Sequence, residues 1–467
     1  MSHRRAWRRA LGGLVCAGLA LPGAREAAAA ALLDVYLQAR QDDPVYLAAL
    51  RQGEAAREFV EQAKSLGRPN VSLALARANT NTVIHRSPGD NVYALGSRSF
   101  PGAEYALTVV QPVYNAVSSA TRVQADARAG QVDAEREAAE QDLAWRVVDR
   151  YCRAAAAREG VLALDAEIVA LQAQRDRVAV RQAAGLARNS ELLEVRARLG
   201  DAQARAAEAR MSSADALRGL TELTGQSLTR LDLLDKGLPA ALLDPIPQDA
   251  VELASDHPLV IARRQAVRVA EAELMRQQGA SRPTVDASLK VGRTRANGSL
   301  FGGGSDIETN ELRLSLNLPL YSGGMLSSRE REAARLLERA QEDRRATQRT
   351  VEREIATALD RIREGRIRHD ALLEAVLSGE EAVRTRQLAY QAGIATNLAV
   401  LDASRELARA RADHARARYE LALAVFLLKR ATGAIGVDDI RRLDALLVPG
   451  PEGAPASTTR DSPRSAS

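Results

Sequence analysis

The sequence carries one series of segments twice, in the same order and at a nearly constant separation. The matching pairs are GRPNVSLALARANT (67–80) with SRPTVDASLKVGRT (281–294), YALTVVQPVYNAVSSATR (105–122) with LRLSLNLPLYSGGMLSSR (312–329), AGLARNSELLEVRARL (184–199) with AGIATNLAVLDASREL (392–407), and LTELTG (220–225) with LLKRATG (427–433). Pro69 and Pro283 are 214 residues apart, and Pro112 and Pro319 are 207 apart. Several ordered matches at one offset indicate an internal duplication, so the fold must consist of two similar halves.

The first thirty residues have the pattern of a signal peptide. Four arginines precede the apolar run from Ala10 to Leu21, and small residues near Ala30 suit signal peptidase. Residues 1–30 contain five arginines and one glutamate, so their removal lowers the formal net charge from +5 to about +1. The mature chain is therefore expected to be exported, and its charge gives no support for a nucleic-acid partner.

The duplication and the signal together divide the chain into five predicted parts. These are a signal peptide (1–30), a first structural repeat of helix, β-hairpin, long helix and helix (31–232), a linker (233–247), a second structural repeat (248–433) and a C-terminal segment with a disordered tail (434–467).

Long helices are predicted in both halves, and a shorter helix before the strands of each half is expected to begin at Asp43-Pro44 and at His257-Pro258. From Ser118 to Ala184 a series of apolar positions is spaced alternately three and four residues apart, which is typical of a coiled coil. The series is Val161, Leu164, Ile168, Leu171 and Val178, with Arg175 before the last position. At ~1.5 Å per residue this helix is about 100 Å long, too long for a compact domain.

A glycine ends the long helix in each half. Gly185 and Gly393 are predicted as the residues after the helix C-terminus, where left-handed backbone is required. Asn189 or Ser190 is then the next N-cap in the first half, and Thr396 or Asn397 in the second. Each half therefore ends in a helical hairpin.

Four segments of about ten residues alternate between apolar and polar side chains, which predicts strands. They are Val71–Thr82, Ala103–Tyr114, Val285–Arg293 and Leu312–Tyr321. Aromatic residues are only 3% of the chain, yet six lie at the predicted strand ends or in adjoining loops: Tyr93, Phe100, Tyr105, Tyr114, Phe301 and Tyr321. One such segment alone is more typical of a soluble sheet. Four in an exported chain, with aromatic ends, indicate membrane strands.

Four strands cannot close a barrel, and an open edge in lipid leaves backbone groups unpaired at several kcal/mol each. Copies of the chain must then share one barrel. Two copies give eight strands, whose interior side chains fill the barrel, and three give twelve strands around a lumen. Polar residues such as Lys290 and Arg313 would line that lumen, and Pro112 and Pro319 would interrupt the ladder where strand passes into helix.

No arrangement of residues predicts an enzyme, a cofactor or a metal. The histidines after the signal, His85, His257, His369 and His414, are scattered and lack metal-ligand spacing. Cys152 is the only cysteine after the signal and is expected to pack inside a helix.

The duplicated order and the segment LNLPLYSGGMLSSREREA resemble the TolC family of outer-membrane efflux and secretion proteins, over nearly the whole mature chain. The resemblance implies a mainly α fold with membrane β structure. In it a homotrimer forms a 12-stranded β-barrel, four strands per chain, continued by a long α-helical coiled-coil tunnel across the periplasm. It also implies an outer-membrane location and docking to an inner-membrane ABC or other transporter through a periplasmic adaptor protein.

The same resemblance implies a gate at the inner end of the tunnel. Alignment of AYQAGIATNLAVLDAS places Tyr390 at the gating tyrosine and Asp402 at one aspartate of a constricting ring. Alignment of AGLARNSELLEV places Ser190 and Glu191 at the partners across the gate. The turns at Gly185 and Gly393 are the expected adaptor-docking points.

Two positions depart from the family pattern. Ala399 stands where a second ring aspartate is found, and Ala395 where a gating arginine is found, so a gate with fewer polar locks is expected. Without the resemblance, Asp402 and Glu191 would be interpreted as partners of a helix dipole and Tyr390 as a packing residue.

Protein export of the type I secretion kind is the favoured function, with a toxin-like protein as the candidate substrate. The alternative is the outer-membrane component of a multidrug efflux pump. A periplasmic coiled-coil scaffold is the alternative from a different class, because it would explain the helical hairpins but not the four strands.

Overall fold

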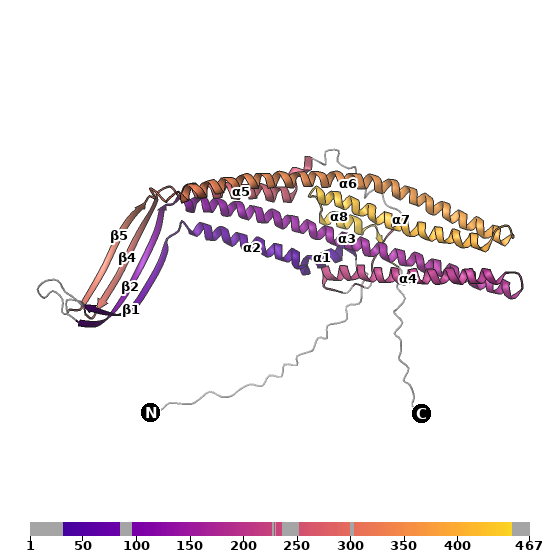
Figure 1. Cartoon of the computed structure of the whole chain (residues 1–467), viewed down its shortest axis with the longest axis horizontal. Helices are drawn as coiled ribbons and strands as arrows, with labels where there is room; N and C mark the ends of the chain where they lie inside the picture. The colour runs from indigo at the N-terminus through magenta and orange to yellow at the C-terminus, as the bar shows by residue number, and fades with distance from the viewer. Residues whose placement is uncertain are drawn as a thin grey trace, which may run out of the picture.

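The structure is a computed structural model that describes residues 31–84, 96–226, 228, 230–235, 252–298 and 303–450. The predicted signal peptide, the tail beyond residue 450 and most of the predicted linker lie outside these residues, as do His85, Tyr93 and Phe301. The chain is elongated, with a β-sheet at one end and the turns of two helical hairpins at the other (Figure 1).

Both halves supply the same elements in the same order. The first half has α2 (Pro44–Ser65), β1 (Asn70–Ile84), β2 (Gly96–Tyr114), α3 (Ala116–Ala183) and α4 (Asn189–Thr224). The second half has α5 (Pro258–Gly279), β4 (Thr284–Ala296), β5 (Ser305–Asn317), α6 (Met325–Gln391) and α7 (Asn397–Ala431). The other described elements are α1 (Leu32–Asp42), β3 (Leu233–Leu234), the 3₁₀ helix η2 (Glu252–Asp256), α8 (Val437–Asp444) and β6 (Leu447–Val448). This order agrees with the duplication predicted from the sequence.

The four long strands form one antiparallel sheet in the order β1-β2-β4-β5. The pairing of β2 with β4 joins the two halves of the chain. Strands β1 and β5 are the edges, and each therefore has a row of backbone N–H and C=O groups that the sheet does not pair. The register of β2 on β4 shifts between Pro112 and Tyr114, where the sequence predicts an interruption.

One face of the sheet is apolar and exposed in the part nearer the helices. The register aligns one apolar residue from each strand in a row: Val71, Val109, Leu289 and Leu312. On β5 the side chains Leu312, Leu314 and Leu316 are 82%, 72% and 68% exposed. The next row, on the opposite face, is polar and consists of Ser72, Thr108, Lys290 and Glu311. Such a face is unfavourable in water, so this sheet requires lipid or another chain against it.

Three strand boundaries predicted from the sequence are wrong. Strand β5 ends at Asn317, not Tyr321, and begins at Ser305, because its polar first residues pair with β4. Strand β2 begins at Gly96, so Tyr105 lies in the middle of the strand and not at its end.

Helices α2 and α5 begin where the sequence predicts. Pro44 and Pro258 occupy the first turns of α2 and α5. Asp43 caps α2 by accepting a hydrogen bond from the N–H of Tyr46 at 2.7 Å, and His257 Nδ1 accepts one from Leu259 at 3.1 Å. Helices α3 and α6 have 68 and 67 residues, which corresponds to about 100 Å each. No described helix is both long and apolar enough to cross a membrane.

The buried seam of α3 differs slightly from the predicted one. Leu171 and Val178 are buried as expected, but Glu167 and Gln174 share the seam with them. Arg175 was predicted there and instead forms an ion pair with the exposed Asp176. The predicted spacing of three and four residues is correct. The polar members of the seam are Glu167 and Gln174 and not Arg175.

The main hydrophobic core lies around the middle of the helices, where α1, α3, α4, α7, α8 and β3 meet. Tyr151, Tyr419 and Phe426 are its largest buried side chains. Strand β3, at the start of the predicted linker, pairs with β6 near the C-terminus. This pairing fixes the junction between the two halves against the C-terminal segment.

Candidate functional site

Both hairpin turns lie at the end of the molecule opposite the sheet (Figure 1). Gly185 and Gly393 have φ of 74° and 73°, the left-handed conformation that glycine adopts without strain. In each turn the residue after the glycine donates a hydrogen bond to a carbonyl five residues earlier, at 2.8 Å, which is a Schellman motif. Those residues, Leu186 and Ile394, are 70% and 84% exposed. Each hairpin therefore presents one apolar side chain at its tip.

The helices after the turns begin differently from each other. Thr396 caps α7, and its hydroxyl accepts a hydrogen bond from the N–H of Ala399, one of the two predicted arrangements. The N-cap position of α4 is Arg188, so the prediction of Asn189 or Ser190 is wrong. Ser190 is the second residue of α4 and is exposed. Glu191 supplies the cap instead, because its Oε1 accepts a hydrogen bond from the N–H of Arg188 at 3.5 Å.

The structure brings Tyr390 and Glu191 together. The Tyr390 hydroxyl, near the end of α6, donates a hydrogen bond to Glu191 Oε2 on α4 at 3.1 Å. Burial and then this carboxylate raise the pKa of Tyr390, so the phenol keeps its proton and remains a donor. Glu191 thus uses one oxygen to cap its own helix and the other to hold the opposite hairpin.

Two further contacts join the hairpins at this end. Gln174 of α3 donates a hydrogen bond to Asn397 Oδ1 of α7 at 2.7 Å, and both side chains are buried. The guanidinium of Arg181 lies 5.1 Å from the centre of the Tyr390 ring, a cation–π contact from α3 to α6. Sequence reasoning did not find Gln174 or Arg181, because neither lies in a segment that matches a motif.

Asp402 forms an ion pair across the hairpins. Its Oδ1 is 2.8 Å from Arg198 Nη2 on α4, and its side chain is 45% exposed. Asp402 is the sixth residue of α7, and the first turn of that helix holds no acidic residue. The alternative in which Asp402 serves the dipole of the first turn is therefore wrong. The positive charge of Arg198 offsets part of the negative charge of Asp402.

Asp402 also lines a cavity between α3, α4 and α7. The cavity measures about 1080 Å³ and is lined by five arginines and five carboxylates. The charged residues of its lining are Arg153, Glu167, Arg205, Asp402, Arg405, Glu406, Arg409, Asp413, Arg416 and Glu420. Those from α7 recur every three or four residues and so form one polar face of that helix. The positive and negative side chains that line the cavity are equal in number.

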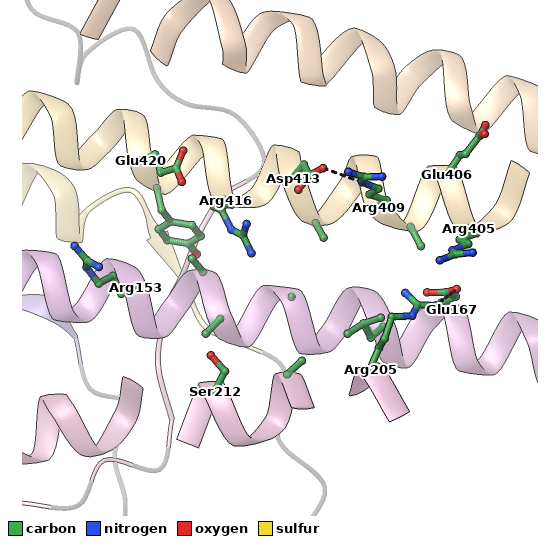
Figure 2. Close-up of a pocket in the computed structure, with 18 of the residues that line it drawn as sticks. Arg153, Glu167, Arg205, Ser212, Arg405, Glu406, Arg409, Asp413, Arg416 and Glu420 are labelled. Carbon is green, nitrogen blue, oxygen red and sulfur yellow. Dashed lines mark hydrogen bonds and ion pairs between the residues drawn. The ribbon is translucent and has the colours of Figure 1, made fainter. Parts of the chain in front are cut away.

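Figure 2 shows how α3 and α4 meet in this cavity. Arg205 of α4 pairs with Glu167 of α3 at 2.9 Å, and the Glu167 side chain is only 5% exposed. Arg405 of α7 points toward the same carboxylate (Figure 2). Some of the charged groups that line the cavity are therefore held in ion pairs between the helices.

Cys152 and His257, two residues of types that often act in catalysis, have structural roles. Cys152 is fully buried, and burial raises the pKa of its thiol to about 12, so it does not ionise near neutral pH. His257 is a helix cap. Among the described residues no group of three or more His, Cys, Asp or Glu side chains is placed to hold one metal ion.

Comparison with known proteins supplies the identification. Residues 250–434 match the family model described as outer membrane efflux protein. The chain is 25% identical to the outer membrane protein TolC of Vibrio cholerae over 418 residues, which covers 89% of this chain and 93% of that protein. The chain is thus similar to TolC-family proteins over nearly its whole length. It is also 26% identical to the proteases secretion protein PrtF of Dickeya chrysanthemi, over 90% of this chain and 91% of that protein.

The fold is that of solved TolC-family structures. The outer membrane protein VceC of Vibrio cholerae superposes with a TM-score of 0.74 at 19% identity, over 86% of this chain and 96% of that protein. The predicted fold class, membrane strands continued by a coiled-coil tunnel, is thereby confirmed for the single chain. The chain is a protein of the outer membrane that extends into the periplasm, and it is a channel for efflux or secretion.

Proposed function

We propose that the chain acts as a homotrimeric channel of a tripartite export system and that its cargo is protein. In this proposal three chains share a barrel of twelve strands and a helical tunnel. A periplasmic adaptor protein and an inner-membrane ABC or other transporter complete the system and deliver the cargo. The comparisons support the channel function. What we propose for this chain is its cargo, its partners and its assembly as a trimer.

The observation that carries the proposal is the form of the sheet. It has four antiparallel strands, an exposed apolar face and two open edges. Edges in lipid must be paired, so copies must join β5 of one chain to β1 of the next. Eight strands from two copies leave an interior just wide enough for side chains, whereas twelve strands from three copies leave a lumen. Three copies therefore suit a channel and two do not.

Protein cargo is supported by the relatives that cover the chain. The PrtF protein of Dickeya chrysanthemi, at 26% identity, is named as a proteases secretion protein. Drug efflux is the second candidate, because the family model that matches the second half is described as an outer membrane efflux protein. The residues at the hairpin ends do not distinguish the two.

Membrane fractionation combined with single-channel recording tests the channel. The mature chain is expected in the outer membrane as a trimer, and the purified trimer is expected to conduct ions in planar bilayers. A scaffold would give neither result. To distinguish cargo, a strain lacking the chain is compared with its parent for secreted proteins and for drug sensitivity. Loss of a secreted protein with unchanged drug sensitivity supports export, and the reverse supports efflux.

We further propose that the hairpin ends form the gate and the adaptor-docking point. Tyr390, Glu191 and Asp402 join the two hairpins, and the turns at Gly185 and Gly393 lie beyond them. Ser190 lies beside Glu191 but points to solvent in one chain, so its proposed partner belongs to another subunit. Ala395 and Ala399 cannot form ionic links, and the gate depends on the contacts that remain.

Replacing Tyr390 by phenylalanine is expected to raise the open probability of the channel. The substitution removes the hydrogen bond to Glu191 but keeps the ring beneath Arg181. One such bond contributes about 1 kcal/mol, or about fivefold in an equilibrium constant for each chain. Recording in planar bilayers measures the change. Tyr321→Phe, at the sheet end of the molecule, is the matched control, and wild-type gating in Tyr390→Phe would show that this bond is not a lock.

Neutralising Asp402 and neutralising Arg198 are expected to have opposite effects on ion selectivity. Asp402→Asn removes one carboxylate per chain from the inner mouth and should move the cation-to-anion permeability ratio toward unity. Arg198→Gln leaves that carboxylate unpaired and should raise the ratio. Reversal potentials in a salt gradient measure both. If the two variants shift the reversal potential in the same direction, or neither shifts it, Asp402 does not lie at the constriction.

A further inference from the structure

Two histidines that are far apart in the sequence meet in the second hairpin. His369 lies on α6 and His414 on α7, and their ring centres are 5.1 Å apart with the planes tilted by 43°. Ion pairs between the same two helices, Arg368 with Glu420 and Arg411 with Glu380, hold this part of the hairpin in register. The pair lies away from the hairpin turns and is not part of the gate.

The hydrogen bonds of these rings leave two nitrogen atoms without partners. Nδ1 of His369 is 3.0 Å from Oδ1 of Asp370. A carboxylate accepts from a ring N–H, so this contact places the proton on Nδ1 and leaves a lone pair on Nε2 of His369. The Nε2 atoms of His369 and His414 are both buried and have no hydrogen-bond partner among the described residues. A buried polar atom left unpaired costs about 1–3 kcal/mol, and two adjacent ones indicate a ligand that binds both.

Charged side chains of both signs surround the rings. The guanidinium of Arg418 lies near His414. The guanidinium of Arg418 is itself paired with Glu159 of α3, which offsets its repulsion of a bound cation. Asp370 supplies a negative charge beside His369. Neutral imidazole is the form that coordinates metal ions.

The spacing of the rings fits a metal ion between them. A Zn²⁺ ion lies roughly 2.0–2.1 Å from an imidazole nitrogen, and with a tetrahedral angle at the metal two bound rings have centres about 5 Å apart. The observed separation is 5.1 Å. The carboxylate on the far nitrogen of His369 is the arrangement by which proteins commonly orient a metal-binding imidazole.

We propose that His369 and His414 together bind a divalent transition-metal ion such as Zn²⁺ through their Nε2 atoms and so join α6 to α7. The described residues supply only two protein ligands, and water completes the coordination. Imidazole ligands favour Zn²⁺, Ni²⁺ and Cu²⁺ over Mg²⁺ and Ca²⁺. The ion would stiffen the second hairpin, whichever cargo the channel carries.

Calorimetric titration with Zn²⁺ tests the proposal directly. The full mature chain is purified in detergent without a polyhistidine tag and is stripped of metal with a chelator. One Zn²⁺ per chain is expected to bind, and His369→Gln and His414→Gln should each weaken binding at least tenfold. Asp370→Asn should weaken binding by about 10–100-fold, as loss of an orienting carboxylate does elsewhere. Mg²⁺ should not compete.

The control is His257→Asn, which removes a histidine but keeps a side chain able to cap α5. This variant should bind Zn²⁺ like the wild type. A second measurement needs no variant: Cu²⁺ bound to the wild-type chain should show electron paramagnetic resonance couplings to two imidazole nitrogens. The proposal is overturned if Zn²⁺ fails to bind, if binding survives in either His369→Gln or His414→Gln, or if bound Cu²⁺ shows no nitrogen couplings.

Discussion

Leu314→Arg is expected to abolish assembly of the chain in the outer membrane. Leu314 lies between Leu312 and Leu316 on the apolar face of β5, is 72% exposed in the single chain and pairs with Ala287 of β4. An arginine facing lipid near the middle of the bilayer costs about 2–4 kcal/mol, and a trimer carries three of them. The amount of trimer in outer-membrane fractions, resolved on gels with and without heating, measures the effect.

The adjacent residue offers a matched control. Ser315 is next along the same strand, on the face that carries Arg313, so Ser315→Arg adds the same side chain to the polar face. This variant should assemble at nearly wild-type levels. Equal trimer yields from Leu314→Arg and Ser315→Arg would contradict the assignment of the leucine face to lipid.

Glu159→Ala is expected to lower the free energy of unfolding by about 3–5 kcal/mol, because it leaves the buried Arg418 without its ion-pair partner. Glu159 on α3 accepts from Arg418 and, at 2.8 Å, from the hydroxyl of Tyr419, both on α7. The Arg418 side chain is only 6% exposed and also donates to the carbonyl oxygens of Leu234 and Asp235. The network therefore joins α3 and α7 to the junction between the two repeats.

Denaturation of the detergent-solubilised chain, followed by circular dichroism, measures this loss. The double variant Glu159→Leu with Arg418→Met removes both charges and should recover much of the stability. Asp360→Ala breaks the exposed pair of Asp360 with Arg363 and should change stability by less than about 1 kcal/mol. A similar small change in Glu159→Ala and Asp360→Ala would show that the buried network adds no stability.

Features that depend on local sequence were predicted well. Proline after Asp43 and after His257 fixes the first turn of a helix, and the helices begin there. Gly185 and Gly393 are needed for positive φ, and both adopt it. Alternation located all four strands, because an apolar face against lipid requires a period of two.

Features that depend on how the helices meet were predicted less well. The polar first half of β5, from Ser305 to Glu311, carries no apolar alternation and is a strand only because β4 pairs with it. Arg198 was missed because nothing in its own segment shows which side of α4 faces Asp402. His369 and His414 are 45 residues apart, so no ligand spacing could be seen until the two helices were packed together.

The pairing of β2 with β4 has a consequence for how the protein evolved its assembly. Within one molecule this contact adds the hairpin of the second repeat to that of the first. Addition of β1 from a neighbour to β5 would continue the same series, so six quasi-equivalent hairpins would surround the axis. In an ancestor with a single repeat, every contact between neighbouring hairpins would be intermolecular. The duplication would then convert half of these contacts into intramolecular ones.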